Sequence, residues 1–149
     1  MLVRAMTLDD CDALEILRDE AALGIDPRAE LGGALTRAWV ACDAISGSAL
    51  GYALCWWVVD ELQILAFGVL PSARRRGVAR DLLAQVISAA RAAGAQRVTL
   101  EVGRNNLAAA RLYEGAGFVV FRVRPQYYRK TGEDALEMEL RVSAAPELS

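Results

Sequence analysis

Apolar residues along the chain follow two spacings, one typical of strands and one typical of helices. Strand-like spacing predicts strands over residues 2–5, 38–43, 49–59, 62–70, 97–102, 118–123 and 135–142. Helical spacing predicts helices that begin at Thr7, at Pro27 and at Val78, and a fourth that Asn105 or Asn106 caps. We expect these helices to end before Gly24, at Leu35, at Ala93 and at residues 115–117, respectively.

The order of these elements predicts the fold class. The early strands follow one another as an antiparallel meander, whereas the later strands alternate with helices. We therefore expect an α/β (α+β) fold, in which a central mixed, mostly antiparallel sheet carries helices on both faces. Residues 1–142 are expected to form a single domain, because a chain of 149 residues can bury one core, and residues 143–149 to form a flexible tail.

Composition argues against several classes of function. Hydrophobic residues make up 54% and charged residues 24% of the chain, which is typical of a globular protein. The net charge of −2 argues against a general nucleic-acid-binding protein. The chain contains no histidine, so acid–base chemistry must come from carboxylates, tyrosines, cysteines, the chain terminus or Lys130, the single lysine.

The cysteines and the hydropathy of the chain indicate the cellular compartment in which we expect the protein. Cys11, Cys42 and Cys55 are far apart and form no CxxC pair, so we expect no structural zinc site and no other metal. Reduced thiols that pack as small apolar residues are typical of a cytoplasmic protein. The longest apolar run, residues 49–59, is shorter than the ~20 residues that cross a bilayer. The N-terminal residues lack a signal-peptide core, so we expect a cytoplasmic protein without a membrane partner.

A basic turn joins the predicted strand 62–70 to the helix that begins at Val78. Pro71 stops strand pairing, arginines occupy residues 74–76, and Gly77 precedes the helix. The first N–H groups of a helix lack intrahelical acceptors and carry partial positive charge, so such a turn is suited to bind an anion. Glycine allows a ligand to approach the backbone, and arginines donate strong hydrogen bonds to phosphate oxygens. We interpret the turn as a pyrophosphate site, although its spacing alone fits a solvated basic helix start equally well.

Three motifs resemble those of the GNAT N-acetyltransferase superfamily. Residues 74–79, Arg-Arg-Arg-Gly-Val-Ala, match its Arg/Gln-x-x-Gly-x-Gly/Ala signature. Residues 100–118 resemble the block LEV…N-x-x-A…LYE-x-x-GF of the ribosomal-protein-alanine N-acetyltransferases. Residues 124–128, followed by 133–135, resemble the ending R-x-x-Y-Y…EDA of the same enzymes. The similarity extends over residues 51–140, whereas the preceding residues match only in overall pattern.

The resemblance implies acetyl-coenzyme A (acetyl-CoA) as co-substrate and a role for each motif. It makes Glu101 the general base and Tyr113 the general acid. The residues that it implies in binding acetyl-CoA are Phe67, Gly68, Val69, Arg74, Arg75, Arg76, Gly77, Val78, Ala79, Arg80, Asn106 and Ala109. Those implied in binding the acceptor are Arg124, Tyr127 and Tyr128. Without the resemblance, the commoner fate of a residue like Glu101 is a solvated carboxylate at a strand end, and that of Tyr113 is a core tyrosine.

The chemistry of the transfer favours an α-amine as the acceptor. At neutral pH, losing a proton costs an α-amino group about 1 kcal/mol and a lysine side chain roughly 4–5 kcal/mol. A carboxylate base such as Glu101 is adequate for the first, so the implied partner is a protein or peptide N-terminus, such as that of a ribosomal protein. Residues 21–28 lack the Phe-x-x-Pro-Trp-like element of the peptide-binding members. A small-molecule amine is therefore an alternative acceptor, a non-catalytic acyl-CoA sensor is another alternative, and the oligomeric state is left open.

Overall fold

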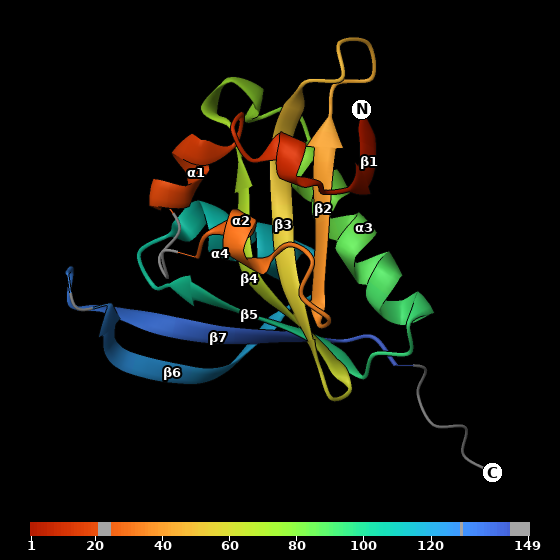
Figure 1. Ribbon diagram of the computed structural model, residues 1–149. Helices are drawn as coiled ribbons and strands as arrows, with labels where there is room; N and C mark the ends of the chain where they lie inside the picture. The colour runs from red at the N-terminus through yellow and green to blue at the C-terminus, as the bar shows by residue number, and fades with distance from the viewer. Residues whose placement is uncertain (21–24, 129, 144–149) are drawn as a thin grey trace.

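The computed structural model describes residues 1–20, 25–128 and 130–143, which form one seven-stranded sheet with helices on both faces (Figure 1). The strands are β1 (Leu2–Ala5), β2 (Thr36–Cys42), β3 (Ala49–Val58), β4 (Glu61–Val69), β5 (Arg97–Gly103), β6 (Val119–Tyr128) and β7 (Glu133–Arg141). The α-helices are α1 (Glu15–Glu20), α2 (Pro27–Glu30), α3 (Val78–Ala92) and α4 (Leu107–Gly115), and the 3-10 helices are η1 (Leu8–Asp10) and η2 (Pro71–Ala73). The predicted fold class is confirmed.

The sheet is mostly antiparallel but contains one parallel pair at its centre. The strand order is β1-β2-β3-β4-β5-β7-β6, and among these neighbours only β4 and β5 run parallel. Their pairing extends from Glu61 opposite Arg97 to Ile64 opposite Leu100. Beyond Ile64, β4 continues to Val69 paired with β3 alone. The two central strands therefore separate, and the edge of β4 that faces β5 has no strand partner there within the described ranges.

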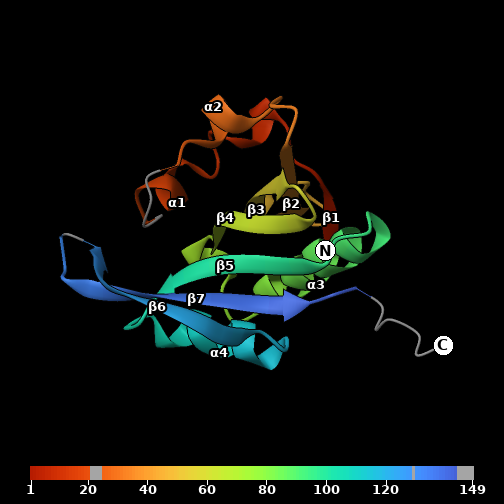
Figure 2. The ribbon, with the colours of Figure 1, turned by 90° about the horizontal axis from the view of Figure 1, so that it is seen from below.

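Apolar side chains fill the space on both faces of the sheet. On one face, α3 packs Leu82 and Val86 onto the strands, and α4 adds Tyr113. On the other face, the N-terminal segment packs Leu14 and Leu17 onto β2, β3 and β4. Seen from below, α1 and α2 lie on one side of the strands, and α3 and α4 on the other (Figure 2). The three cysteines are unpaired and buried as small apolar residues, as the sequence predicts.

The prediction of one continuous first helix is wrong. Between Asp10 and Leu17, backbone N–H groups bond carbonyl oxygens three residues back, so the chain forms η1 and tight turns before α1 begins at Glu15. The Asp10 carboxylate accepts the Thr7 N–H at 2.8 Å, which is the reciprocal bond of a capping box and marks a helical start at Thr7. The predicted end before Gly24 lies outside the described residues.

The predicted second helix is too long. Its pattern covers residues 27–35, but α2 ends at Glu30. Leu31 is extended, and Gly32 has φ +90°, a left-handed conformation that glycine adopts without strain. Two successive glycines have low helix propensity, which explains the early end. Of the predicted C-terminal tail, residues 144–149 lie outside the described residues.

Strand β6 extends beyond the predicted residues 118–123, as far as Tyr128. Its pairing with β7 shifts in register between Arg124 and Tyr128. Within that stretch, Gln126 has φ +51° and donates its N–H to the Asp134 carboxylate at 3.0 Å. The partner strand thus extends the pairing past the point where the apolar pattern of β6 ends, and it carries the tyrosines of β6 to the separated ends of β4 and β5.

Candidate active site

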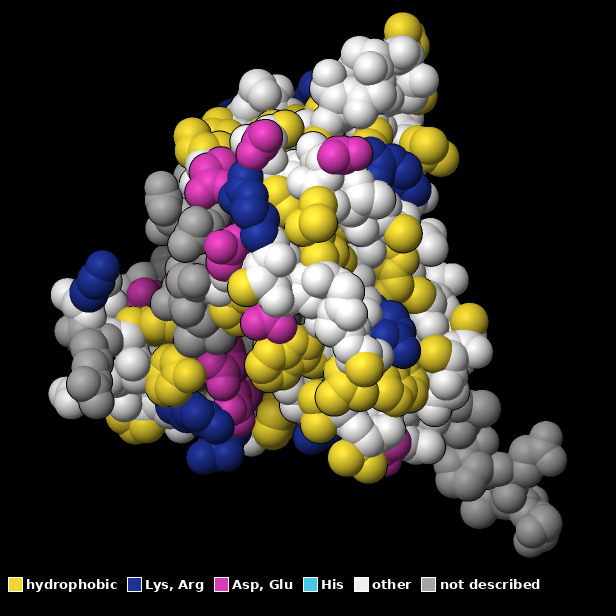
Figure 3. Space-filling view, viewed as in Figure 1, with side chains coloured by type: hydrophobic (Ala, Val, Ile, Leu, Met, Phe, Trp, Pro, Cys, Tyr) yellow, Lys and Arg dark blue, Asp and Glu magenta, His cyan; other side chains and the backbone are white. Residues whose placement is uncertain are grey.

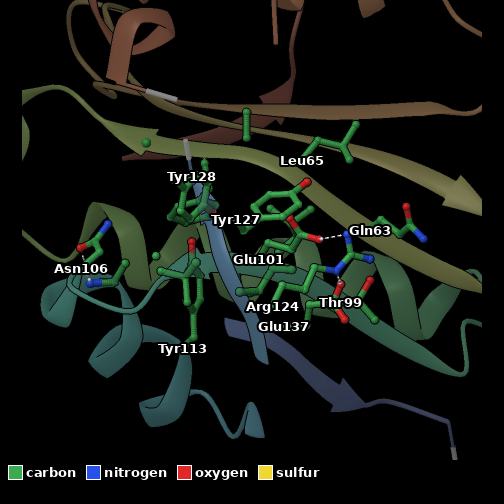
Figure 4. A pocket seen from close by; sticks show the side chains of 18 of the residues that line it. Gln63, Leu65, Thr99, Glu101, Asn106, Tyr113, Arg124, Tyr127, Tyr128 and Glu137 are labelled. Atoms are coloured by element: carbon green, nitrogen blue, oxygen red, sulfur yellow. Dashed lines mark hydrogen bonds and ion pairs between the residues drawn. The ribbon is translucent and has the colours of Figure 1, made fainter. Parts of the chain in front are cut away.

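A cavity of about 620 Å³ lies where β4 and β5 separate. Its wall combines the end of β4, the middle of β5, the start of α4 and the β6–β7 hairpin (Figure 4). Because it touches Leu17 on one side of the sheet and α4 on the other, the cavity passes between the two strands. The predicted site residues that line it are Phe67, Gly68, Arg74, Glu101, Asn106, Ala109, Tyr113, Arg124, Tyr127 and Tyr128.

The other predicted cofactor residues lie beside the cavity, at the end of β4 and the start of α3. They are Val69, Arg75, Arg76, Gly77, Val78, Ala79 and Arg80. Val69 and Val78 are 7% and 3% exposed and pack in the core, so only their backbone can meet a ligand. Arg75, Arg76 and Arg80 are exposed, so their side chains can reach a ligand on the surface.

The start of α3 has a backbone geometry suited to an anion. Arg75 has φ +64° and Gly77 has φ +77°, so the loop takes two left-handed conformations before the helix begins. No side chain caps α3, and the Asp81 N–H, which bonds the Gly77 carbonyl, makes the first bond of the helix. The preceding N–H groups lack an intrahelical acceptor, and the helix dipole favours an anion at this end. The Arg74 Nε donates to the Val69 carbonyl at 3.0 Å, which ties the loop to the end of β4.

Glu101 on β5 lines the cavity with its side chain 23% exposed. Its neighbours Leu100 and Val102 are in the core, so strand alternation directs Glu101 to the opposite face. Its Oε2 atom is buried and has no hydrogen-bond partner among the described residues. Burial raises the pKa of Glu101 above its usual value near 4.5; the neighbouring Glu137 carboxylate adds to the rise, and the Arg124 charge opposes it. Glu101 is therefore a stronger base than a carboxylate in water.

Tyr113 on α4 reaches the same cavity from the other face of the sheet. Its ring packs edge to face against Phe67 and Phe118, with centroid distances of 6.1 and 5.8 Å, and its hydroxyl points into the cavity (Figure 4). Burial raises the pKa of Tyr113, so the phenol remains protonated at neutral pH and can donate. Asn106 caps α4 by accepting the Ala109 N–H at 3.2 Å. The side-chain oxygen of Asn106 is thus engaged by the helix, and its NH₂ group can donate to a ligand.

The three predicted acceptor-binding residues form one cluster on β6. The rings of Tyr127 and Tyr128 pack edge to face at 5.2 Å, and the Arg124 guanidinium lies 5.4 Å from the Tyr127 ring centroid. Burial raises the pKa of Tyr128 to about 12, and the Glu101 charge adds to the rise. Arg124 forms an ion pair with Glu137 at 2.8 Å and lies 4.0 Å from Glu101. The cluster therefore surrounds the proposed base.

Sequence reasoning missed a polar part of the cavity wall on the face opposite α4. Gln63, Thr99 and Glu137 come from β4, β5 and β7 and line the cavity together. In the predicted alternation, Thr99 lies on the same face of its strand as Glu101. This was the one sequence signal that pointed to the polar part of the wall. Glu137 is only 8% exposed, whereas glutamate in an alternating strand is typical of a solvated face. At the surface, acidic side chains gather over β5 and β7, bordered by basic ones (Figure 3).

The described ranges contain neither a metal-ligand cluster nor a helix suited to cross a membrane. No cluster of three or more histidine, cysteine, aspartate or glutamate side chains there could hold a metal ion. None of the helices in those ranges has the length and apolar character needed to cross a membrane.

The chain belongs to the acetyltransferase (GNAT) family, whose sequence profile matches residues 9–118. The family resemblance of the motifs is thereby confirmed. A ribosomal protein bS18-alanine N-acetyltransferase from Salmonella typhimurium is 36% identical over 94 residues, which cover 62% of this chain and 64% of that protein. Across three such curated relatives, the matched segment covers 54% to 64% of the relative, so the chain spans less than two thirds of their length.

Solved structures agree with this family. The ribosomal-protein-S18-alanine N-acetyltransferase from Escherichia coli superposes with a TM-score of 0.86 at 27% identity, covering 99% of this chain and 97% of that chain. The protein yncA from Salmonella typhimurium, solved with its cofactor acetyl-CoA, has a TM-score of 0.77 at 25% identity, covering 100% and 99% of the two chains. The similarity of structure thus includes the N-terminal residues that the sequence motifs do not reach.

Proposed function

We propose that this protein is an acetyl-CoA-dependent N-acetyltransferase that acts on the α-amine of a protein or peptide N-terminus. The observation that carries the proposal is the shared cavity. It combines the β4 edge that lacks a strand partner, the buried carboxylate of Glu101 and the hydroxyl of Tyr113. Membership of the GNAT family and similarity to the E. coli ribosomal-protein-S18-alanine N-acetyltransferase support the same activity.

The described residues fit acetyl-CoA as co-substrate. Between Leu65 and Val69, the β4 backbone groups that face away from β3 are available to an extended arm, as an added strand would use them. The uncapped start of α3 and its arginines suit a pyrophosphate. A Cβ at Gly77 would lie 3.2 Å from the Arg80 guanidinium, so a larger residue would crowd this loop. When bound, acetyl-CoA supplies the acetyl group as a thioester.

Glu101 and Tyr113 divide the proton transfers in this proposal. Glu101 accepts the proton that the attacking amine loses, directly or through water, and its raised pKa strengthens it as a base. Tyr113, which burial keeps protonated, donates to the departing sulfur. The new C–N bond forms as the C–S bond breaks, so the amine loses one proton and the sulfur gains one. Because the two side chains enter the cavity from opposite faces of the sheet, they can act on opposite sides of the acetyl carbon.

The acceptor class follows from the base and from the cluster around it. At neutral pH, releasing a proton costs an α-amine about 1 kcal/mol and a lysine side chain roughly 4–5 kcal/mol, so a carboxylate base meets a much smaller demand with an α-amine. The rings of Tyr127 and Tyr128 offer contact area and polar ends to an extended peptide, and Arg124 offers a donor to its carbonyl groups. These features favour a peptide N-terminus over a lysine side chain.

The decisive experiment is a panel of acceptors incubated with acetyl-CoA and analysed by mass spectrometry. Peptides with a free, small N-terminal residue should gain one acetyl group, and the same peptides with a blocked N-terminus and a free lysine should react much more slowly. Polyamines and amino acids form the third arm, and Glu101→Gln reports the turnover that does not depend on the proposed base. Turnover of the small amines while every free peptide N-terminus remains unmodified would replace the peptide acceptor by a small-molecule one. No turnover of any amine would favour an acyl-CoA sensor.

Binding of the co-substrate is tested at Gly77 with a matched control. Gly77→Glu introduces bulk and negative charge where the pyrophosphate is proposed to bind. The variant should lose the rise in melting temperature that acetyl-CoA produces by stabilising the native state. Gly94→Glu makes the same substitution in the same left-handed conformation, φ +82° against +77°, at the other end of α3, with no neighbouring atom within 4 Å. It should retain the full shift, and an equal shift in both variants would contradict the pyrophosphate assignment.

A further inference from the structure

Glu137 is a second acidic residue in the cavity wall, directly opposite Glu101. In the antiparallel pairing of β5 with β7, Glu101 and Glu137 are register partners. Glu137 is 8% exposed and lines the same cavity. Like charges directly opposite one another in a sheet are destabilising unless a counter-charge lies between them. The counter-charge here is arginine from β6 (Figure 4).

The arginines are shared unequally between the two carboxylates. Arg124 Nε lies 2.8 Å from Glu137 Oε1 as an ion pair, although its N–H has no well-aligned acceptor among the described residues, whereas Arg124 Nη1 lies 4.0 Å from Glu101 Oε1. Arg122 Nε lies 3.6 Å from the second oxygen of Glu137. Glu137 therefore has arginine beside both of its oxygens, while Oε2 of Glu101 is buried without a partner among the described residues.

The other ionisable groups of the cavity are arginines, tyrosines and Glu61, and among them the Tyr127 side chain, through a hydrogen bond, opposes the rise that burial causes in the pKa of Glu101. Besides Glu101 and Glu137, these groups are Tyr52, Glu61, Arg74, Arg97, Tyr113, Arg122, Arg124, Tyr127 and Tyr128. Arg97 is held between Glu61 at 2.6 Å and Glu139 at 2.5 Å, at the far end of the parallel pair. Arg74 is tied to the end of β4 through its bond to the Val69 carbonyl. Arg124 is thus the cation nearest to Glu101 among the ion pairs of the described residues.

We propose that Glu137 is a positioning residue that holds Arg124 on its own carboxylate and so keeps the Glu101 carboxylate available to the acceptor amine. The inference rests on the proposed function only in naming the amine; the charge arrangement itself belongs to the free protein. Without the Glu137 charge, the nearest carboxylate to Arg124 is Glu101. Arg124 would then pair with Glu101, through the Oε1 atom that it already approaches, and make Glu101 a weaker base.

The proposal predicts a change in the titration of Glu101 itself. An opposite charge moved to within hydrogen-bonding distance lowers the pKa of a carboxyl group by about 1–3 units. In Glu137→Gln we therefore expect the Glu101 pKa to fall by about one unit or more. The measurement is the ¹³C chemical shift of the glutamate side-chain carboxyls against pH, with the Glu101 signal assigned by its loss in Glu101→Gln.

Two control variants separate this role from a structural one. Glu139→Gln makes the same change on the same face of β7, at a residue paired with Arg97 and Arg141 and outside the cavity wall, and should leave the Glu101 titration unchanged. Glu137→Asp keeps the charge and should hold the Glu101 pKa close to that of the native protein. Glu137→Asp also tests the proposal if Glu137→Gln perturbs folding. A decrease of the Glu101 pKa by about one unit or more in Glu137→Asp would contradict the proposal.

A double-mutant cycle tests whether Arg124 is the agent. Glu137→Gln should lower the Glu101 pKa more in the native background than in an Arg124→Gln background, because the second background contains no Arg124 to be released. The proposal would be overturned if Glu137→Gln lowered the Glu101 pKa equally in the native and Arg124→Gln backgrounds, or in neither of them. In the transfer assay, Glu137→Gln should lower kcat about tenfold with a smaller change in KM. If no amine is acetylated at all, the proposed function fails while the titration still decides the role of Glu137.

Discussion

Asp10 and Glu101 are both carboxylates withdrawn from water, but their surroundings are opposite. Asp10, at the turn after β1, accepts two hydrogen bonds from Arg4 at 2.9 and 2.7 Å and one from the Thr7 N–H at 2.8 Å. Glu101, in the cavity, has its nearest cation at 4.0 Å and a buried oxygen without a partner among the described residues. One carboxylate is satisfied by its neighbours, and the other is left with unused hydrogen-bonding capacity.

The pKa values of the two groups move in opposite directions for this reason. The Arg4 hydrogen bonds, assisted by the Thr7 N–H, hold the pKa of Asp10 below its usual value despite burial. Burial, assisted by Glu137, raises the pKa of Glu101. A lowered pKa means that the folded state favours the ionised form, so Asp10 stabilises the fold. A raised pKa means that the folded state disfavours it, so Glu101 costs stability and provides a reactive base.

The largest effect that this comparison predicts is on catalysis. Glu101→Gln keeps the size of the side chain but removes its basicity, so acetyl transfer should slow by roughly 10²–10⁴-fold. Activity should partly recover at high pH, where the amine is deprotonated without a base. Asp10→Asn should leave kcat within about twofold of the native value, since Asp10 lies outside the cavity. Steady-state kinetics from pH 6 to 10 would check both; an unaffected rate in Glu101→Gln would remove its assignment as the base.

The next effect is on stability and concerns Asp10. Asp10→Asn should lower the free energy of unfolding by about 1–2 kcal/mol at neutral pH, a modest value because the Arg4 side chain is 40% exposed. Asp9→Asn, at an exposed neighbour, should change it by less than about 0.5 kcal/mol. Stability from a lowered carboxyl pKa is present above the unfolded-state pKa and is lost as pH falls through the folded-state pKa. Urea unfolding at pH 7 and at pH 3 should therefore show the difference between Asp10→Asn and the native protein shrinking in acid.

The smallest effect is a gain in stability from the loss of the base. Because the Glu101 pKa is raised, the folded protein loses stability as pH rises from the usual carboxyl value, near 4.5, through the raised value. Glu101→Gln should remove that loss and raise the free energy of unfolding at pH 7 by up to about 1 kcal/mol. The gain should vanish below pH 4, where Glu101 is protonated in both states. A destabilised Glu101→Gln at pH 7 would mean that the carboxylate is better satisfied than the geometry indicates.

The elements that the sequence predicted well are those defined by local spacing. Helix α3 spans Val78–Ala92 against the expected 78–93, and Gly94, with φ +82°, follows it as the predicted stop. The errors fall where a tertiary partner or tight turns override the local pattern. The first predicted helix is divided into η1, tight turns and α1, and pairing with β7 lengthened β6.

For the site, the sequence by itself determined which residues could carry the chemistry. Without histidine, acid–base chemistry falls to carboxylates, tyrosines, cysteines, the chain terminus or Lys130, and the family resemblance singled out Glu101 and Tyr113 among them. Strand alternation put Glu101 on the face opposite the apolar residues of β5. Only the tertiary structure decided that β4 and β5 separate beyond Ile64, which opens one cavity to both side chains. The tertiary structure also decided that Glu137 lies opposite Glu101 and forms the closer ion pair with Arg124. The physical reason is that spacing and propensity act over a few residues, whereas strand register and burial depend on pairing between segments that are distant in the chain.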